Sequence, residues 1–116
     1  MSVSEDYIAY VLDQLRGVGP VTARRMFGGV GLYLDGVIFA LIADNILYLK
    51  VDDSNRPDYE AADMGPFSPY GENLRTSSYY QVPGDVLEDE ERLRLWVNKA
   101  FNVAIRKASA SKGKKA

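Results

Sequence analysis

The chain contains no cysteine and no histidine among its 116 residues. Without cysteine it can form no disulfide, offers no thiolate nucleophile and cannot build a zinc site with thiolate ligands. Without histidine it lacks the commonest metal ligand and the side chain best suited to proton transfer near neutral pH. These two absences predict a protein that is not an enzyme and that holds neither a metal nor a cofactor.

Long hydrophobic runs are absent as well. No run approaches the ~18 residues that a membrane-spanning helix requires, and the first twenty residues carry acidic groups where a signal peptide would carry basic ones. We therefore expect a cytoplasmic protein with no membrane partner. Hydrophobic residues make up 47% of the chain and charged residues 26%, so one globular domain with a single core is expected.

No acidic residue follows Glu91, and this divides the chain by charge. Residues 1–91 hold all 16 acidic groups and 6 basic ones, a net charge of −10, whereas residues 92–116 hold 8 basic groups, a net charge of +8. A basic end can attract nucleic acid. A solvated helix face followed by a solubilising tail is the simpler explanation, and the acidic body argues against a large phosphate-binding face.

Three segments have the features of helices. Ser4 can cap the first, which should end near Gly17, and a short second helix is expected around residues 57–62. The third should run from about Glu90 to Ala108, with an acidic start and an apolar stripe that can cover a sheet. Residues 109–116 are expected to form a flexible basic tail beyond a domain of residues 1–108.

The segments between these helices have the patterns of strands. Residues 21–27, 30–34, 37–43 and 46–51 are expected to be extended, and residues 77–82 return to strand character after an irregular connection. Asp35-Gly36 and Asp44-Asn45 are two-residue turns of the kind that joins antiparallel strands. The sequence thus predicts an α+β fold. An antiparallel meander of four to five strands should pack against an N-terminal helix, a short middle helix and a long C-terminal helix.

A glycine cluster precedes the first of these turns. Gly28, Gly29 and Gly31 lead into a strand rather than a helix, and no lysine and hydroxyl residue follow as a phosphate-binding loop requires. The dinucleotide-binding pattern fails too, because it would need glycine where Leu34 stands. We therefore interpret these glycines, with Asp35-Gly36, as structural.

Acidic residues gather after the strand that ends at residue 51. Asp52, Asp53, Asp58 and Glu60 could in principle act as acids and bases or bind a hard cation. Their spacing does not match a calcium loop, so a solvated acidic loop is the simpler interpretation.

A surface for binding is suggested by aromatic and basic residues in the predicted strands. Aromatic residues there can stack on bases or meet a partner protein, although cross-strand packing under a helix is the simpler explanation for each tyrosine. By alternation Arg24 and Arg25 point to opposite faces of their strand, so only one of them should belong to a given contact surface. The candidate residues are Arg24, Arg25, Tyr33, Tyr48, Lys50, Tyr79 and Tyr80.

The order of these motifs resembles the N-terminal domain of the TfoX/Sxy competence regulators over residues 5–107. The resemblance rests on the segments at 22–29, 31–33, 35–40, 47–53, 55–56, 66–67, 78–80 and 82–83, and on Trp96. It implies an α+β regulatory domain without catalytic residues. It further implies that full-length members help the cyclic-AMP receptor protein at competence promoters and carry a second, helical domain, whereas this chain is expected to be a stand-alone first domain.

Three functions remain open at this point, and the least favoured is an enzyme that uses Asp52, Asp53 and Asp58, with or without a metal ion. The first is a regulatory module that binds a protein, such as a component or regulator of the transcription machinery. The second is direct binding of nucleic acid through Arg24, Arg25, Lys50, the strand tyrosines and the basic tail. An exposed strand edge would also allow a homodimer.

Overall fold

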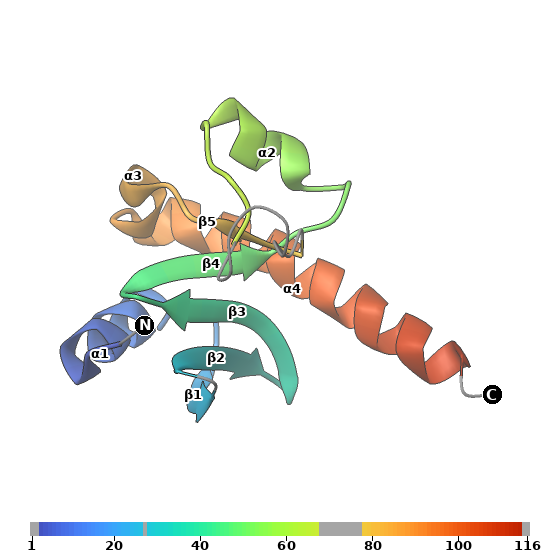
Figure 1. The fold of residues 1–116 in the computed structure, drawn as a ribbon, viewed down its shortest axis with the longest axis horizontal. Coiled ribbons are helices and arrows are strands. Elements are labelled where there is room, and N and C mark those ends of the chain that lie inside the picture. The colour runs from blue at the N-terminus through green and yellow to red at the C-terminus, as the bar shows by residue number, and fades with distance from the viewer. Residues whose placement is uncertain (1–2, 27, 68–77, 115–116) are drawn as a thin grey trace.

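The computed structural model describes residues 3–26, 28–67 and 78–114, with side chains as far as Ser109. Its elements in chain order are α1 (Glu5–Gln14), β1 (Thr22–Met26), β2 (Gly29–Leu34), β3 (Val37–Ala43), β4 (Ile46–Lys50), α2 (Arg56–Ala61), β5 (Tyr79–Gln81), α3 (Gly84–Leu87) and α4 (Glu90–Lys114). Figure 1 shows α4 passing behind β4 and continuing past the sheet towards the C-terminus. The predicted α+β class is confirmed.

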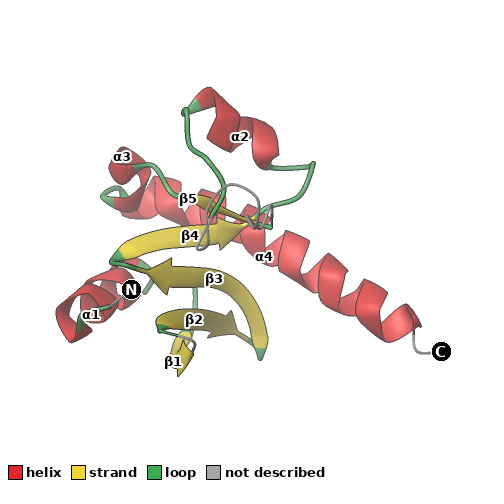
Figure 2. Ribbon diagram, in the orientation of Figure 1, coloured by secondary structure: helices red, strands yellow, loops and turns green. Residues whose placement is uncertain are grey.

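The five strands form one antiparallel sheet in the order β1-β2-β3-β4-β5. The predicted meander is therefore confirmed (Figure 2). The apolar segment 37–43 forms the central strand, as a run without polar residues favours.

Both predicted two-residue turns adopt the left-handed backbone that a type I′ turn requires. The φ angles are 53° and 78° at Asp35 and Gly36, and 55° and 56° at Asp44 and Asn45. This conformation matches the twist of the strands it joins, so each turn sets the register of its hairpin.

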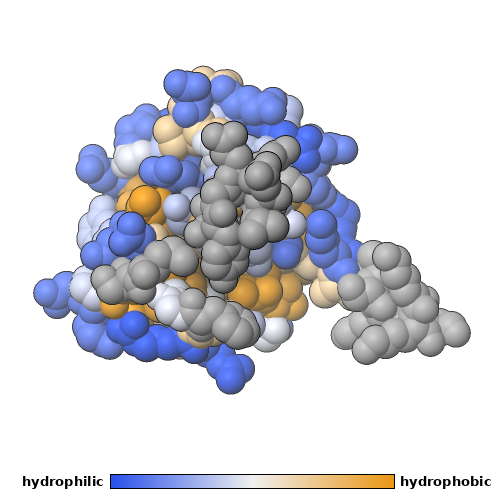
Figure 3. Space-filling view, in the orientation of Figure 1, coloured by the Kyte–Doolittle hydropathy of each residue, from blue (hydrophilic) through white to orange (hydrophobic). Residues whose placement is uncertain are grey.

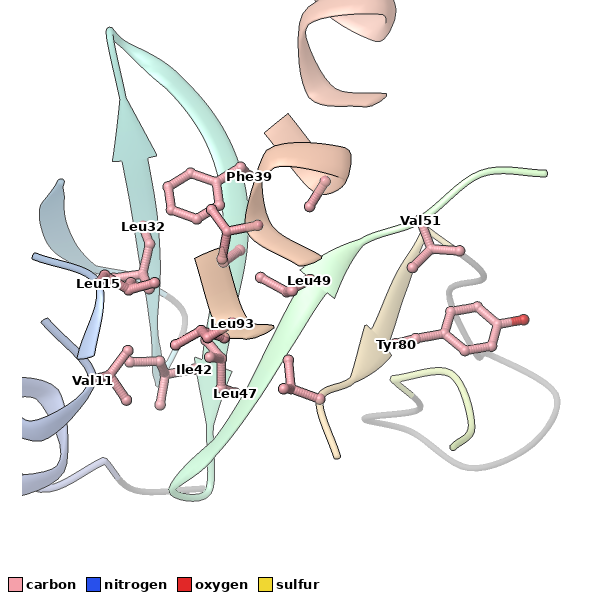
Figure 4. Close-up of a cluster of buried hydrophobic side chains, with 14 of the residues drawn as sticks. Val11, Leu15, Leu32, Phe39, Ile42, Leu47, Leu49, Val51, Tyr80 and Leu93 are labelled. Atoms are coloured by element: carbon pink, nitrogen blue, oxygen red, sulfur yellow. The ribbon is translucent and has the colours of Figure 1, made fainter. Parts of the chain in front are cut away.

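The core lies between one face of the sheet and the helices α1 and α4. Figure 4 shows side chains from α1, from β2 to β4 and from α4 converging there. A register shift between β2 and β3 pairs Leu32 with Ala40 and Tyr33 with Ile38, which leaves Phe39 as an extra residue. Phe39 is fully buried, and its ring meets the edge of Phe101 in α4 at 6.4 Å between centroids.

The observed helices differ from the predicted ones in their ends and in one additional short helix. α1 ends at Gln14 and is followed by a hydrogen-bonded turn, although Ser4 caps it as expected by accepting a hydrogen bond from the Tyr7 amide at 3.1 Å. The short α3 was not predicted. α4 continues to Lys114 because alanine and lysine favour a helix and no glycine or proline intervenes before Gly113.

The backbone of residues 109–114 is thus helical where a flexible tail was expected, while the division into a domain and a tail stays a prediction. The expected connection at 65–71 lies partly outside the described residues. Within the described part of the chain, no helix combines the length and apolarity needed to cross a bilayer.

Candidate interaction face

The two faces of the sheet are defined by the strand register. We call the face that packs on α1 and α4 the inner face and the opposite one the outer face. Directly paired residues share a face, so the chain of pairs from Arg24 through Gly31 and Leu41 to Tyr48 lies on one side. Side chains two positions apart in a strand share a face. Tyr33, two residues after Gly31, and Lys50, two residues after Tyr48, therefore lie on this side too, and Tyr79 pairs with Lys50. The outer face therefore carries Arg24, Tyr33, Tyr48, Lys50 and Tyr79.

Arg24 and Arg25 lie on opposite faces, as their alternation predicted. The Arg24 guanidinium is exposed on the outer face, 6.0 Å from the centre of the Tyr33 ring. Arg25 instead bonds to the Glu5 carboxylate at 2.7 Å and to the Val3 carbonyl at 3.2 Å. Arg25 thus fastens β1 to the start of α1, and of the two arginines only Arg24 is available to the outer face.

Lys50 lies half-buried on the outer face beside Tyr79. Its Nζ is 4.7 Å from the centre of the Tyr79 ring and donates a long hydrogen bond of 3.4 Å to the Tyr79 hydroxyl. Burial lowers the pKa of Lys50, and the positive charge of Lys107 lowers it further. Burial raises the pKa of Tyr79 to about 12.

The four candidate tyrosines differ in exposure. Tyr33 and Tyr48 are half-buried, and the Tyr48 ring packs against Phe67 with 4.8 Å between centroids. Tyr79 and Tyr80 are both only 8% exposed. Viewed from the side shown in Figure 3, hydrophobic residues reach the surface in patches bordered by hydrophilic ones. Tyr33 and Tyr48 therefore offer contact area that Tyr79 and Tyr80 do not.

Tyr80 belongs to the inner face. It pairs with Leu49, and its ring lies 5.7 Å from that of Tyr59, which in turn meets Trp96 at 4.7 Å. This aromatic cluster joins α2, β5 and α4. Cross-strand and helix packing, rather than a binding role, accounts for Tyr80.

The glycines are needed for two reasons: a positive φ angle at Gly28 and Gly36, and a lack of space for a side chain at Gly29 and Gly31. Gly28 and Gly36 have φ angles of 81° and 78°. A Cβ at Gly29 would lie 2.8 Å from the Ile42 carbonyl oxygen, and one at Gly31 would lie 2.9 Å from the Met26 Cε. Gly29 and Gly31 thus let backbone and outer-face side chains approach β2 closely.

Three of the four acidic residues named after β4 are paired with basic ones. Asp52 contacts Arg106 at 3.2 Å, Asp58 contacts Lys99 at 2.8 Å, and Asp53 pairs with Arg56. The Ser54 hydroxyl holds the pKa of Asp52 below its usual range, with the Arg106 guanidinium adding to the effect. The Asp52–Arg106 pair ties the loop after β4 to α4, and the Asp58–Lys99 pair ties α2 to the same helix. Among the described residues no group of three potential acidic ligands gathers.

A groove that the sequence did not indicate lies beside α4, at the edge of the sheet where β2 and β4 end and β3 begins. It has a volume of about 570 Å³ and lies between the β2–β3 turn and the last turns of α4. Lys107 lines it, although the pattern of the predicted helix gives no sign that this residue meets the sheet. The residues that line the groove include Tyr33, Asp35, Ile38, Lys50, Ala104 and Lys107.

Comparison with known proteins identifies relatives over most of the chain. The family model of the TfoX N-terminal domain matches residues 13–104. A 12.7 kDa protein from the 5′ region of trpE in Spirochaeta aurantia, described as uncharacterized, is 31% identical over 94 residues, which cover 81% of this chain and 76% of that protein.

Proposed function

The chain belongs to the TfoX N-terminal domain family, a family of regulatory rather than catalytic domains, and we propose that it acts by binding a protein in the cytoplasm. We infer further that the partner is a component or regulator of the transcription machinery and that it docks on the outer face. Arg24, Tyr33 and Tyr48 would provide the contacts. Arg25 and Tyr80, on the inner face, would not take part.

The observation that carries this proposal is the unpaired charge on the outer face. Among the described residues, no carboxylate pairs with Arg24 or Lys50. Arginine and tyrosine are enriched in protein interfaces because they combine a large contact area with hydrogen bonding. An acidic partner surface would complement these two cations.

The contact surface can be tested by site-specific crosslinking. A photoreactive phenylalanine analogue at position 24 should crosslink to one protein in the source cell, because covalent capture still detects the weaker complex that remains without the arginine. The same analogue at Asn98, which is exposed on α4, should not. The captured protein is then purified, and its affinity for the wild-type chain is measured by calorimetry. Arg24→Ala should weaken it by about tenfold or more, as for a central interface arginine.

Arg25→Ala is the matched control, since it removes the same charge one residue along the strand. Equal weakening by the two variants would contradict docking on the outer face. Equal crosslinking from positions 24 and 98 would contradict it as well.

Direct binding of nucleic acid is the second candidate function. It is favoured by three cations without an ion pair in the described structure, namely Arg24, Lys50 and Lys107. Fluorescence anisotropy with single- and double-stranded oligonucleotides would test it. Affinity should fall steeply as salt rises if phosphates are contacted. No binding at low salt would eliminate this candidate.

A further inference from the structure

The groove between the β2–β3 turn and the end of α4 has the size of a small-molecule site. Its volume of about 570 Å³ lies within the range of roughly 300–1,000 Å³ that is typical of ligand pockets. Lys50 approaches it from the end of β4 and Lys107 from α4. Tyr33 and Asp35 approach it from the β2–β3 hairpin.

Two ammonium groups converge on this groove without an ion pair. Within the described structure, Lys99 and Arg106 on the same helix are paired with Asp58 and Asp52, but Lys107 has no such partner. Lys50 has none either, and it donates a hydrogen bond of 3.4 Å to the Tyr79 hydroxyl. Since Lys107 lowers the pKa of Lys50, the two charges repel each other, and a bound anion would relieve that repulsion.

The remaining walls offer a surface for an organic group. Ile38 and Ala104 provide apolar contacts, and Tyr33 adds a half-buried ring. Asp35, exposed at the rim, can accept a hydrogen bond from a hydroxyl group. Its negative charge disfavours an extended polyanion such as a nucleic acid strand.

We propose that this groove binds a small organic phosphate, with its phosphate on Lys50 and Lys107 and its organic part against Tyr33 and Ile38. A phosphate monoester carries a charge of about −1.5 to −2 near neutral pH, which the two lysines balance. This ligand site goes beyond the proposed protein binding, because it requires no partner protein.

Titration of the isolated, ¹⁵N-labelled chain tests the site. The probes are inorganic phosphate, glucose 6-phosphate and phenyl phosphate, each added at constant ionic strength and pH. Saturable amide shifts should cluster at Gly36, Ile38, Lys50 and Ala108, which line the groove. At least one organic phosphate should bind more tightly than inorganic phosphate.

Three variants that each remove one positive charge distinguish binding in the groove from general screening of the basic helix. Lys50→Met and Lys107→Gln should each weaken binding by about tenfold, since each removes a charged donor to the phosphate. Arg94→Gln removes the same charge from an exposed part of α4 that does not line the groove. It should leave the affinity unchanged, and thermal unfolding of each variant verifies that it is folded.

Two results would overturn the proposal. One is the absence of saturable shifts up to about 10 mM of every probe, a concentration at which even a weak specific site would fill. The other is equal weakening by Arg94→Gln, which would mean that the phosphates only screen the basic helix. Because no partner is present, either result leaves crosslinking at position 24 as a separate test of protein binding.

Discussion

On the inner face of the sheet most strand side chains are buried against the helices, whereas on the outer face most are half-buried or exposed and include two cations without an ion pair in the described structure. The adjacent residues Arg24 and Arg25 show the difference most directly. Arg25 is bonded to α1, and Arg24 rests only near a tyrosine ring. The side chains of the inner face thus stabilise the fold. On the outer face, Arg24 and Lys50 have no ion pair in the described structure, and the partial burial of Lys50 costs solvation free energy.

The largest expected effect comes from shortening neighbouring residues of β3 that lie on different faces. Phe39→Ala should lower the free energy of unfolding by about 3–5 kcal/mol, because it leaves a cavity between the sheet and Phe101. Ile38→Ala, on the outer face, should cost about 1 kcal/mol, because the half-buried site can fill with water. Urea unfolding measures both. Equal losses would mean that the outer face is a second core.

Replacing Gly29 or Gly31 of β2 by alanine should have an intermediate effect on the free energy of unfolding. Gly29→Ala should cost about 1–3 kcal/mol, because the new methyl group would lie 2.8 Å from the backbone oxygen of Ile42. Gly31→Ala should cost less, since its nearest neighbour is the end of the flexible Met26 side chain at 2.9 Å. Thermal unfolding of both variants ranks them. The reverse order would show that β2 shifts more easily than the outer-face side chains do.

Two buried tyrosines should respond with opposite signs near neutral pH. The Tyr59 hydroxyl is buried without a hydrogen-bond partner in the described structure, so Tyr59→Phe should stabilise the fold by about 1 kcal/mol. Tyr79→Phe should destabilise it by about 0.5–1 kcal/mol, because it removes the hydroxyl that accepts from Lys50. Chemical unfolding at pH 7 measures the pair, and a loss in Tyr59→Phe would reveal a partner for its hydroxyl.

The same tyrosines predict a loss of stability in alkali. Burial raises the pKa of both, to about 12 for Tyr79, whereas tyrosine in the unfolded chain titrates near 10. Above pH 10 the unfolded chain therefore binds fewer protons, and stability falls as pH rises towards the folded pKa. Tyr59→Phe and Tyr79→Phe should each reduce the fall in the free energy of unfolding between pH 10 and 11. An unchanged slope in both would contradict the assigned burial.

The sequence predicts the sheet because each of its signals is local. The turns at Asp35-Gly36 and Asp44-Asn45 fix the hairpins, and the alternation in β4 separates Leu49 from Lys50. The continuation of α4 beyond Ala108 agrees with the local helix propensity of alanine and lysine, although a tail was expected there. The bulge at Phe39, by contrast, depends on how α4 meets the sheet, which no local pattern records. The groove could not be predicted for the same reason, since Lys107 reaches Lys50 only through that tertiary contact.

The smallest expected effect on stability is also the sharpest test of the comparison. Arg25→Ala should lower the free energy of unfolding by less than about 1 kcal/mol, because its ion pair with Glu5 is exposed to solvent. Arg24→Ala should change it by no more than a few tenths, as expected for a surface side chain without an ion pair. Partner affinity should show the opposite order, with Arg24→Ala weakening it and Arg25→Ala leaving it unchanged. Urea unfolding and calorimetry on the same two preparations measure both orders. If Arg24→Ala proved the more destabilising variant, the charge of Arg24 would stabilise the fold, and this result would contradict the proposal that the outer face is a binding surface.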